Sequence, residues 1–254
     1  METLHTIVGL RQALAPLREG RTVGLVPTMG ALHDGHLALI AAARADCDVV
    51  VASLFVNPAQ FGEPADLDAY PHDLARDEGV AADAGVNLLF APAAGELYPP
   101  GFATWVVPEG AAEGLEGEHR PGHFRGVATV CVKLFELVRP DAAYFGRKDA
   151  QQLAVVKQVV RDLNLDVEIR AVETVRDDDG LALSSRNAGL SPAERTRALA
   201  IPRALATRDP DRARAMLDAA GIEPDYIAVA DLDGETLAIA ARIGTIRLID
   251  NVKL

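Results

Sequence analysis

Two histidines, His33 and His36, stand three residues apart in the stretch TMGALHDGHLALI, which is the part of the chain best suited to chemistry. Residues three apart on a helical turn share a face, so the two imidazoles can contact one ligand together. The apolar run Val23–Val26 precedes them and breaks at Pro27, which predicts a buried strand leading into a helix N-terminus. Free backbone N–H groups and the positive end of the helix dipole favour phosphate at such a point. The pattern therefore points to a nucleotide.

Two simpler interpretations compete with this one. Asp34 can serve as the N-cap of an ordinary helix while His36 faces water. The imidazoles can also bind a metal, but no third His or Cys lies nearby and the HExxH spacing of zinc sites is absent. Because two glycines and a buried strand flank the histidines, we favour the phosphate clamp.

The composition limits the fold and the partners. The chain has 254 residues, of which 49% are hydrophobic and 24% charged, as is usual for a soluble globular protein of one large or two modest domains. We expect no membrane partner, because the sequence has no run of about twenty apolar residues and its N-terminus lacks the order of a signal peptide. The net charge of −12 also argues against a nucleic-acid partner.

The two cysteines indicate a reducing compartment. Cys47 and Cys131 each lie in apolar surroundings. We therefore expect two buried free thiols rather than a disulfide, and a cytoplasmic protein.

An acidic protein that binds a polyphosphate must gather its positive charges locally. Three pairs of cations along the chain fit this requirement. They are Arg120 with Arg125, Arg147 with Lys148, and Arg176 with Arg186.

The middle of the chain alternates strand-like and helix-like segments. We expect strands at 48–56, 87–91, 142–145 and 166–172, and helices at 66–84, 126–138 and 149–163. The run 48–56 is almost continuously apolar, as a parallel strand buried on both faces requires. Repeated strand–helix units predict an α/β fold with a Rossmann-like, doubly wound parallel sheet and right-handed crossovers.

The pattern changes after Thr174. Residues 176–180 predict a hairpin tip, which we favour over a metal site built on their three aspartates. Ser191 marks a capped helix start, and two strands are expected at 237–243 and 245–250. The sequence thus predicts a nucleotide-binding domain at 1–174 and a smaller α+β C-terminal lid domain at 175–254.

Polar side chains stand where the predicted strands end, which is where ligands bind in such sheets. An asparagine and a glutamine follow the second strand, and a Gly-x-Lys-Asp segment followed by two glutamines comes after the strand at 142–145. Two hydroxyls and an arginine open the second domain, and together they can donate several hydrogen bonds to phosphate oxygens. The residues of these loops are Thr28, Met29, Asn57, Gln60, Gly146, Lys148, Asp149, Gln151, Gln152, Ser184, Ser185 and Arg186.

Taken in order, these loops resemble the pantoate–β-alanine ligase (pantothenate synthetase) family of the HIGH-type nucleotidylyltransferase group. The likeness covers nearly the whole chain and is weakest between residues 195 and 231. The matching segments are VPTMGALHDGH, SLFVNPAQFGEPADLDAYPHDLARD, RPGHFRGVATV, YFGRKDAQQ, LSSRN and ARIGTIRLIDN.

The resemblance implies a two-step reaction that uses ATP and Mg²⁺ in a cytoplasmic homodimer. The carboxylate of pantoate attacks the α-phosphate of ATP, which gives pantoyl-adenylate and pyrophosphate. The amine of β-alanine then displaces AMP to give pantothenate. Adenylation converts a carboxylate, which is a poor acyl donor, into one with a good leaving group.

The resemblance also implies roles for particular residues, carried over by position. Catalytic roles fall to His33, His36, Lys148, Ser185 and Arg186, and pantoate and β-alanine are placed at Asn57, Gln60, Arg120 and Gln152. No side chain is assigned to a metal. ATP is placed at Met29, Gly30, Ala31, Leu32, His33, Asp34, Gly35, His36, Gly146, Arg147, Lys148, Asp149, Val175, Leu183, Ser184, Ser185 and Arg186. Arg147 and Leu183 depart from the family, which usually carries glutamate or glutamine at the first position and methionine at the second.

Two rival functions are compatible with the same motifs. Another HIGH-type nucleotidylyltransferase would act on a phosphorylated acceptor, but such an acceptor needs extra cations, whereas Gln60 and Gln152 suit a hydroxyl and a carboxylate. A nucleotide-binding regulatory module without turnover would have no need to keep His36, Lys148 and Arg186 together.

Overall fold

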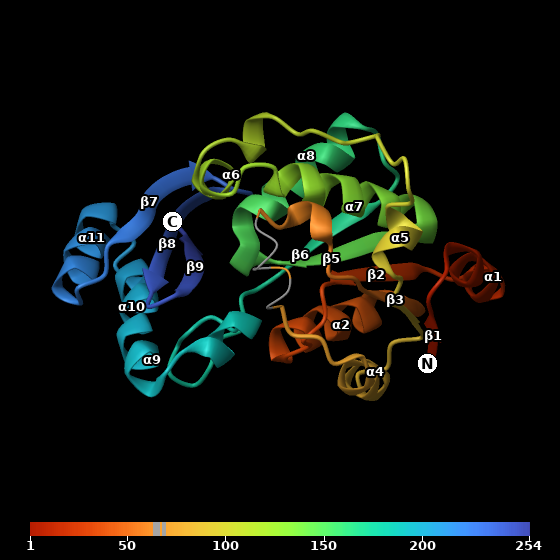
Figure 1. Ribbon diagram of the computed structural model, residues 1–254, viewed down its shortest axis with the longest axis horizontal. Helices are drawn as coiled ribbons and strands as arrows, with labels where there is room; N and C mark the ends of the chain where they lie inside the picture. Colours follow the sequence, from red (N-terminus) through yellow and green to blue (C-terminus); the bar gives the residue numbers. More distant parts are fainter. Residues whose placement is uncertain (63–66, 68–69) are drawn as a thin grey trace.

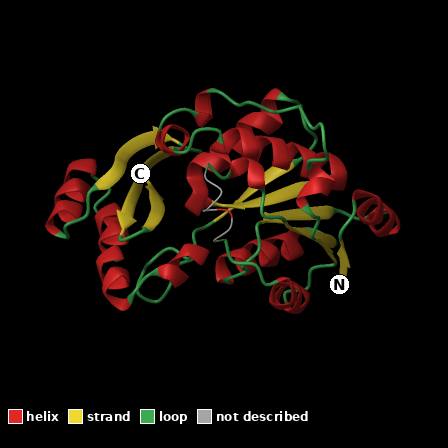
Figure 2. Cartoon of the chain, in the orientation of Figure 1, coloured by secondary structure: helices red, strands yellow, loops and turns green. Residues whose placement is uncertain are grey.

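Two sheets of different type organise the chain in this computed structural model, which describes residues 1–62, 67 and 70–254 (Figures 1 and 2). The larger sheet is parallel and has the strand order β1-β4-β3-β2-β5-β6; the smaller is antiparallel and has the order β7-β8-β9. The strands are β1 (Glu2–Leu4), β2 (Val23–Thr28), β3 (Val49–Leu54), β4 (Leu88–Phe90), β5 (Ala142–Gly146), β6 (Glu168–Val172), β7 (Pro224–Asp231), β8 (Glu235–Ile243) and β9 (Ile246–Lys253). The predicted fold class is confirmed.

Helices cover both faces of the parallel sheet, as the sequence of its strands requires. Val49 and Val51 of β3 pack in the cluster that contains α1, α7 and α8, whereas Val50 packs in the cluster that contains α2 and α4. Successive side chains of a strand point to opposite faces, so a strand covered on both faces must be apolar throughout. The helices are α1 (Ile7–Arg18), α2 (Asp34–Asp46), α4 (Leu74–Asp83), α5 (Ala94–Leu97), α6 (Leu115–His119), α7 (His123–Val138), α8 (Ala150–Asp162), α9 (Pro192–Ala198), α10 (Ala200–Ala206) and α11 (Pro210–Ala219).

The order of the strands reverses at β2, and this fixes where a ligand can bind. From β2 the chain proceeds to β3 and β4 on one side, while β5 and β6 lie on the other. At such a switch point the loops at the carboxyl ends of neighbouring strands diverge and leave a crevice. The loops after β2, β3 and β5 therefore meet at one edge of the sheet.

The smaller sheet has its own apolar core, built with the helices that precede it in the chain. Ile201, Leu205 and Leu217 from α10 and α11 pack against Leu237 and Ile239 of β8. Ser191 caps α9 in a capping box with Glu194, as predicted, and this fixes the start of the helical segment.

Several element boundaries differ from those predicted. The helix at 126–138 begins earlier, at His123, and the one at 149–163 begins at Ala150, after a 3₁₀ turn at Arg147–Asp149. The prediction of helix at 66–84 lies partly outside the described residues, and within them α4 covers Leu74–Asp83. Strands β1 and β7 and helix α1 were not predicted. Strand β1 is only three residues long, β7 is mostly only partly buried, and α1 carries Pro16 inside it.

Candidate active site

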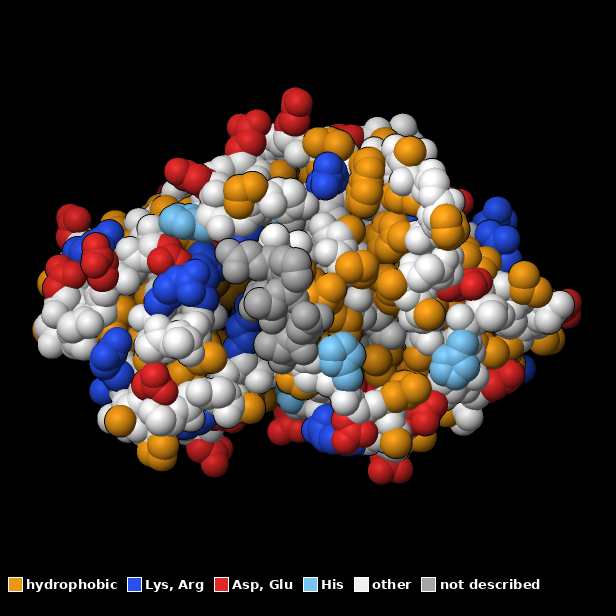
Figure 3. Space-filling model, viewed as in Figure 1, with side chains coloured by type: hydrophobic (Ala, Val, Ile, Leu, Met, Phe, Trp, Pro, Cys, Tyr) orange, Lys and Arg blue, Asp and Glu red, His pale blue; other side chains and the backbone are white. Residues whose placement is uncertain are grey.

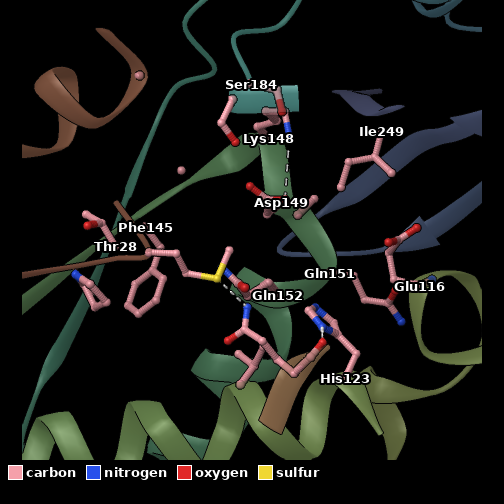
Figure 4. A pocket seen from close by; sticks show the side chains of 18 of the residues that line it. Thr28, Glu116, His123, Phe145, Lys148, Asp149, Gln151, Gln152, Ser184 and Ile249 are labelled. Atoms are coloured by element: carbon pink, nitrogen blue, oxygen red, sulfur yellow. Dashed lines mark hydrogen bonds and ion pairs between the residues drawn. The ribbon is translucent and has the colours of Figure 1, made fainter. Parts of the chain in front are cut away.

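A deep cleft opens at the switch point, between the carboxyl edge of the parallel sheet and the smaller sheet. It encloses about 250 Å³ and is lined from β2, β3, α7, β5, α8 and β9. Lys and Arg side chains gather to the left of the centre of the face shown in Figure 3. Figure 4 shows Lys148 and Ser184 on one side of the pocket and Gln152, Gln151 and His123 on the other. A ligand in this cleft would touch both parts of the chain.

The two histidines form one wall, and their rings pack against each other with the planes tilted by 38°. Their ring centroids lie 4.1 Å apart. His33 is the N-cap of α2: its Nδ1 accepts from the N–H of Gly35 at 3.1 Å, and Nδ1 of His36 accepts from the N–H of His33 at 3.3 Å. A Cβ on Gly35 would come within 2.8 Å of the ring of His33, so this turn needs glycine. The alternative with Asp34 as N-cap and a solvated His36 is therefore wrong.

These caps fix the protonation of both rings. A backbone N–H can only donate, so each Nδ1 must accept and the proton of the neutral ring sits on Nε2. Burial lowers the pKa of His36 to about 3, and the neighbouring His33 acts in the same direction. Burial and then Lys148 also lower the pKa of His33. At neutral pH both rings thus offer a neutral Nε2–H, which suits hydrogen bonds to phosphate oxygens.

A buried carboxylate holds the loop that precedes the histidines. Asp77 of α4 is 1% exposed, and its oxygens accept from the N–H groups of Ala31 at 2.7 Å and Leu32 at 2.9 Å. Arg76 donates to the same carboxylate at 3.1 Å. Gly30, with φ of +86°, lets the loop turn. The backbone N–H groups of Ala31 and Leu32, two residues that the resemblance assigns to ATP, are therefore engaged within the protein.

Gln60 is oriented by a chain of hydrogen bonds. Its Oε1 accepts from Nδ2 of Asn57 at 3.0 Å, and its Nε2 lies 3.1 Å from Sδ of Met29. Its carbonyl accepts from Nδ1 of His123 at 2.9 Å, and Nε2 of that ring accepts from Arg120 at 3.2 Å. Burial, followed by the charge of Arg120, lowers the pKa of His123 to about 4, so this ring too is neutral.

Close packing of α7 on the loop after β3 makes this arrangement compact. A Cβ on Gly126 would approach the carbonyl oxygen of Ala59 to 2.3 Å, so the helix must carry glycine there. Asn57 also donates to the carbonyl of Gly126 at 3.1 Å. Gln60 is thus held by backbone geometry as well as by side chains.

The loop after β5 supplies a cation and an amide. Lys148 and Asp149 line the cleft, 3.8 Å apart between Nζ and Oδ1, and Gln152 follows one turn later on α8. The preceding Gln151 is structural: its amide nitrogen donates to the carbonyls of Ala111, Glu113 and Gly114, and its Oε1 accepts from the N–H of Glu116. The two adjacent glutamines therefore have different tasks.

The C-terminal part closes the cleft through polar contacts. Asn251 of β9 donates to the carbonyls of Arg147 and Lys148 at 2.9 and 2.8 Å. Across the cleft, Arg247 forms a bidentate pair with the buried Glu116, with both distances 2.7 Å. Burial acts to raise the pKa of Glu116, but the bonds and charge of Arg247 outweigh it and the pKa lies below its usual value.

The structure brings most of the predicted site residues to the cleft, but not all of them. Gly30, Ala31, Leu32, Asp34 and Arg147 do not line it. Those that do are Met29, His33, Gly35, His36, Asn57, Gln60, Arg120, Gly146, Lys148, Asp149, Gln152, Val175, Leu183, Ser184, Ser185 and Arg186.

Of the six cations expected near the ligand, three line the cleft and three do not. Arg125 lies over the ring of Trp105, with its Cζ 4.6 Å from the ring centroid. Arg176 pairs with Asp250 at 2.6 Å. Arg147 pairs with Glu173 at 2.8 Å and Asp233 at 2.9 Å, where its charge is engaged by two carboxylates. The cations at the cleft are Arg120, Lys148 and Arg186.

Sequence reasoning missed three residues that build the site. His123 lies inside the segment RPGHFRGVATV, so the resemblance included its position but did not indicate its contacts with Gln60 and Arg120. Asp77 and Glu116 act on loops distant in sequence, and no local pattern shows which backbone N–H or guanidinium they meet.

Other predictions about the chain have plain outcomes. Both cysteines are free, as expected, but Cys47 is only half-buried while Cys131 is buried. The segment 176–180 forms a hairpin tip, closed by a bridge between Arg176 and Ala182. Within the described ranges, no group of three or more His, Cys, Asp or Glu could hold a metal ion, and no helix is long and apolar enough to cross a membrane.

Comparison with known proteins adds an independent finding. A family model described as pantoate-beta-alanine ligase matches residues 2–253. A pantothenate synthetase of Heliobacterium modesticaldum is 53% identical, over 92% of this chain and 92% of its own length. Pantothenate synthetase 1 of Bradyrhizobium diazoefficiens is 48% identical, over 100% of this chain and 98% of its own.

Solved structures agree with the sequence relatives. A pantothenate synthetase from Thermus thermophilus superposes with a TM-score of 0.94 at 46% identity, covering 100% of this chain and 99% of that one. A pantoate-beta-alanine ligase from Francisella tularensis, complexed with beta-gamma ATP and beta-alanine, gives 0.91 at 36% identity, covering 100% and 97%.

Proposed function

The chain belongs to the pantoate–β-alanine ligase family, and from this premise we propose how its cleft joins pantoate to β-alanine at the expense of ATP. The protein is an enzyme, an ATP-dependent acid–amine ligase of pantothenate biosynthesis. The assignment of roles rests on one observation, which is that neutral histidines, cations and oriented amides line one cleft. They are His33 and His36, then Arg120, Lys148 and Arg186, and then Asn57 and Gln60. A nucleotidylyltransferase for a phosphorylated acceptor, or a module without turnover, is not favoured.

In the first step, a carboxylate oxygen of pantoate forms a bond to the α-phosphorus of ATP, and the bond from that phosphorus to the bridging oxygen breaks. Pyrophosphate leaves with the electron pair. The Nε2–H groups of His33 and His36, with Lys148, donate to the phosphate oxygens as charge moves onto them. Ser185 and Arg186 meet the same phosphates from the C-terminal side.

In the second step, the amine nitrogen of β-alanine attacks the acyl carbon, and the bond between that carbon and the AMP oxygen breaks. The amine loses a proton and AMP leaves. We assign Gln60, Gln152 and Asn57 to holding the acid, and Arg120 to the carboxylate of the amine. Arg120 is suited to this task because His123 accepts from it at 3.2 Å and so fixes its direction.

Mg²⁺ fits this site as a companion of ATP. It prefers phosphate oxygens and one or two carboxylates to a cage made of protein side chains. Asp149, next to Lys148 in the cleft, is the carboxylate that would help to hold the ion. When bound, the ion would neutralise charge on the phosphates, and the protein residues would position the reactants.

We further propose a boundary near residue 174, with residues 175–254 as a lid over the nucleotide. Glu173, Thr174 and Val175 line the cleft, so the chain passes from one part to the other within the site. Two free thiols support a reducing, cytoplasmic location.

We propose a homodimer as the assembled form. Trp105 is 36% and Val107 66% exposed on the extended segment between α5 and α6, and hydrophobic side chains gather over this part of the surface in Figure 3. Exposed apolar patches of this kind mark interaction sites. Light scattering should give twice the chain mass, and Trp105→Glu should give the single mass; a monomeric wild type would contradict the proposal.

The test of the function is product release from the purified protein. With ATP, Mg²⁺ and pantoate we expect pyrophosphate, and with β-alanine added we expect AMP and pantothenate. Pyrophosphate formation that does not need pantoate, or the absence of both products, would overturn it. Gln152→Ala should raise the KM for pantoate more than the KM for ATP; the reverse order would remove Gln152 from the acid site.

A further inference from the structure

The floor of the cleft is apolar and contains one conspicuous polar group. It is formed where α7 crosses the ends of β2, β3 and β5, and its residues face the same side of the sheet. The apolar lining consists of Pro27, Phe55, Val127, Val130, Cys131, Leu134 and Phe145. Burial raises the pKa of the Cys131 thiol to about 12, so this side chain stays neutral and adds no charge to the floor.

Ser53 is placed in this floor by the register of β3. It follows Val49 and Val51 at even spacing, and both of these pack in the cluster on the α7 side. Alternation along a strand therefore turns Ser53 to the same side. This residue is 1% exposed and lines the cleft.

The hydroxyl of Ser53 is buried and has no hydrogen-bond partner among the described residues. Its neighbours do not need it: the hydroxyl of Thr28 donates to the Ser53 carbonyl at 2.7 Å, and Gln60 is engaged by Asn57 and Met29. A buried polar group is normally paired, because leaving it unpaired in an apolar site is costly. An orphan hydroxyl at the wall of a ligand cleft indicates a partner on the ligand.

The orientation of pantoate in the cleft determines which of its groups pairs with the Ser53 hydroxyl. Pantoate carries its reacting carboxylate at one end, a hydroxyl on carbon 4 at the other, and two methyl groups between them. The carboxylate must face the phosphate-binding side, near His36 and Lys148. The remote end then points to the floor, where methyl groups meet apolar side chains.

We propose that the Ser53 hydroxyl recognises the 4-hydroxyl of pantoate and so selects this acid over analogues that lack it. The inference rests on the proposed function and deepens it. A site built to bond a substrate hydroxyl rejects the analogue without it, because the protein group is then left unpaired. Ser53 acts in binding and takes no part in proton transfer.

The experiment compares two acids on two proteins. Wild type and Ser53→Ala are assayed for pyrophosphate release with pantoate and with 2-hydroxy-3,3-dimethylbutanoate, which lacks the 4-hydroxyl. We expect Ser53→Ala to lower kcat/KM for pantoate by about 10–100-fold and to change it for the deoxy acid by less than about threefold. The preference of the enzyme for pantoate should fall by the same factor.

Two controls separate recognition from structure. Thr129→Val removes a buried hydroxyl of α7 that donates to the carbonyl of Arg125 and does not line the cleft, so the preference between the acids should stay at the wild-type ratio. The melting temperature of Ser53→Ala should equal or exceed that of wild type, because the lost hydroxyl has no partner to leave behind.

Two results would overturn the inference. One is a Ser53→Ala enzyme that keeps the wild-type preference. The other is a Ser53→Ala enzyme whose kcat/KM falls by the same factor for both acids. A wild type that releases no pyrophosphate with either acid would instead overturn the proposed function, so the two failures are distinguishable.

Discussion

The loop at residues 28–36 and the C-terminal sheet both face the cleft, but different forces hold them there. The loop is held by a buried carboxylate, Asp77, which accepts from two backbone N–H groups, and by histidines that cap one another. The sheet meets the rest of the site through ion pairs, Glu116 with Arg247 and Asp233 with Arg147. The wall that carries the histidines is therefore held by bonds inside one part of the chain, whereas the opposite wall rests on ion pairs between the two parts.

The largest effect, on kcat, is expected for His36 in the wall that carries the histidines. His36→Ala removes a positioned Nε2–H donor, and kcat should fall by about two to three orders of magnitude. Steady-state kinetics with saturating ATP and pantoate measures it. His72→Ala removes an exposed histidine and should leave kcat unchanged; equal rates for both variants would remove His36 from the chemistry.

The next effect tests how the loop is held. Asp77→Ala leaves the N–H groups of Ala31 and Leu32 without their acceptor, so the free energy of unfolding should fall by about 2–4 kcal/mol. Urea denaturation measures this, with Asp83→Ala as the control, because Asp83 is exposed at the end of the same helix. Similar losses in the two variants would mean that the loop does not depend on Asp77.

The neutral histidines predict a pH dependence of stability. The pKa of His123 is about 4 in the folded state and near 6.5 when unfolded, so the unfolded state binds more protons between these values. Stability should therefore fall as the pH drops from about 6.5 to 4, by on the order of 2–3 kcal/mol from this group. His123→Gln should show a shallower fall in urea titrations across this window. An unchanged slope would show that His123 is already charged in the fold.

The smallest effect is expected for the ion pairs of the C-terminal side. Arg147→Met should cost at most about 1 kcal/mol of stability, because its partner Glu173 is largely exposed and such pairs are screened. Its KM for ATP should stay within about twofold of wild type, since Arg147 does not line the cleft. A tenfold rise in that KM would mean that Arg147 contacts the nucleotide, and that its ion pairs do more than hold the C-terminal sheet.

The sequence predicted the fold where local pattern and tertiary structure agree. The apolar run at 48–56 became β3, and the Ser191–Glu194 capping box starts α9 where the residues indicate. It failed at β7, where burial is partial, and at α1, which carries a proline inside the helix.

The site was predictable in its outline and not in its internal pairing. His36, Gln60 and Lys148 were predicted from loops that follow strands, because the carboxyl ends of parallel strands converge. Arg186 was predicted from the two hydroxyls and the arginine that open the second domain. Which cations remain available depends on partners far along the chain. Arg147 lies next to Lys148 in sequence, yet Asp233, 86 residues away, draws it out of the site.

The central claim is that one cleft adenylates pantoate before the amine arrives, and an isotope test addresses it most directly. Pantoate labelled with ¹⁸O in its carboxylate is converted with ATP and β-alanine, and the AMP is analysed by mass spectrometry. An acyl-adenylate places one carboxylate oxygen on the α-phosphorus and leaves it there when the amine attacks, so AMP should carry one ¹⁸O. AMP without the label, with pantothenate formed at the normal rate, would contradict the account.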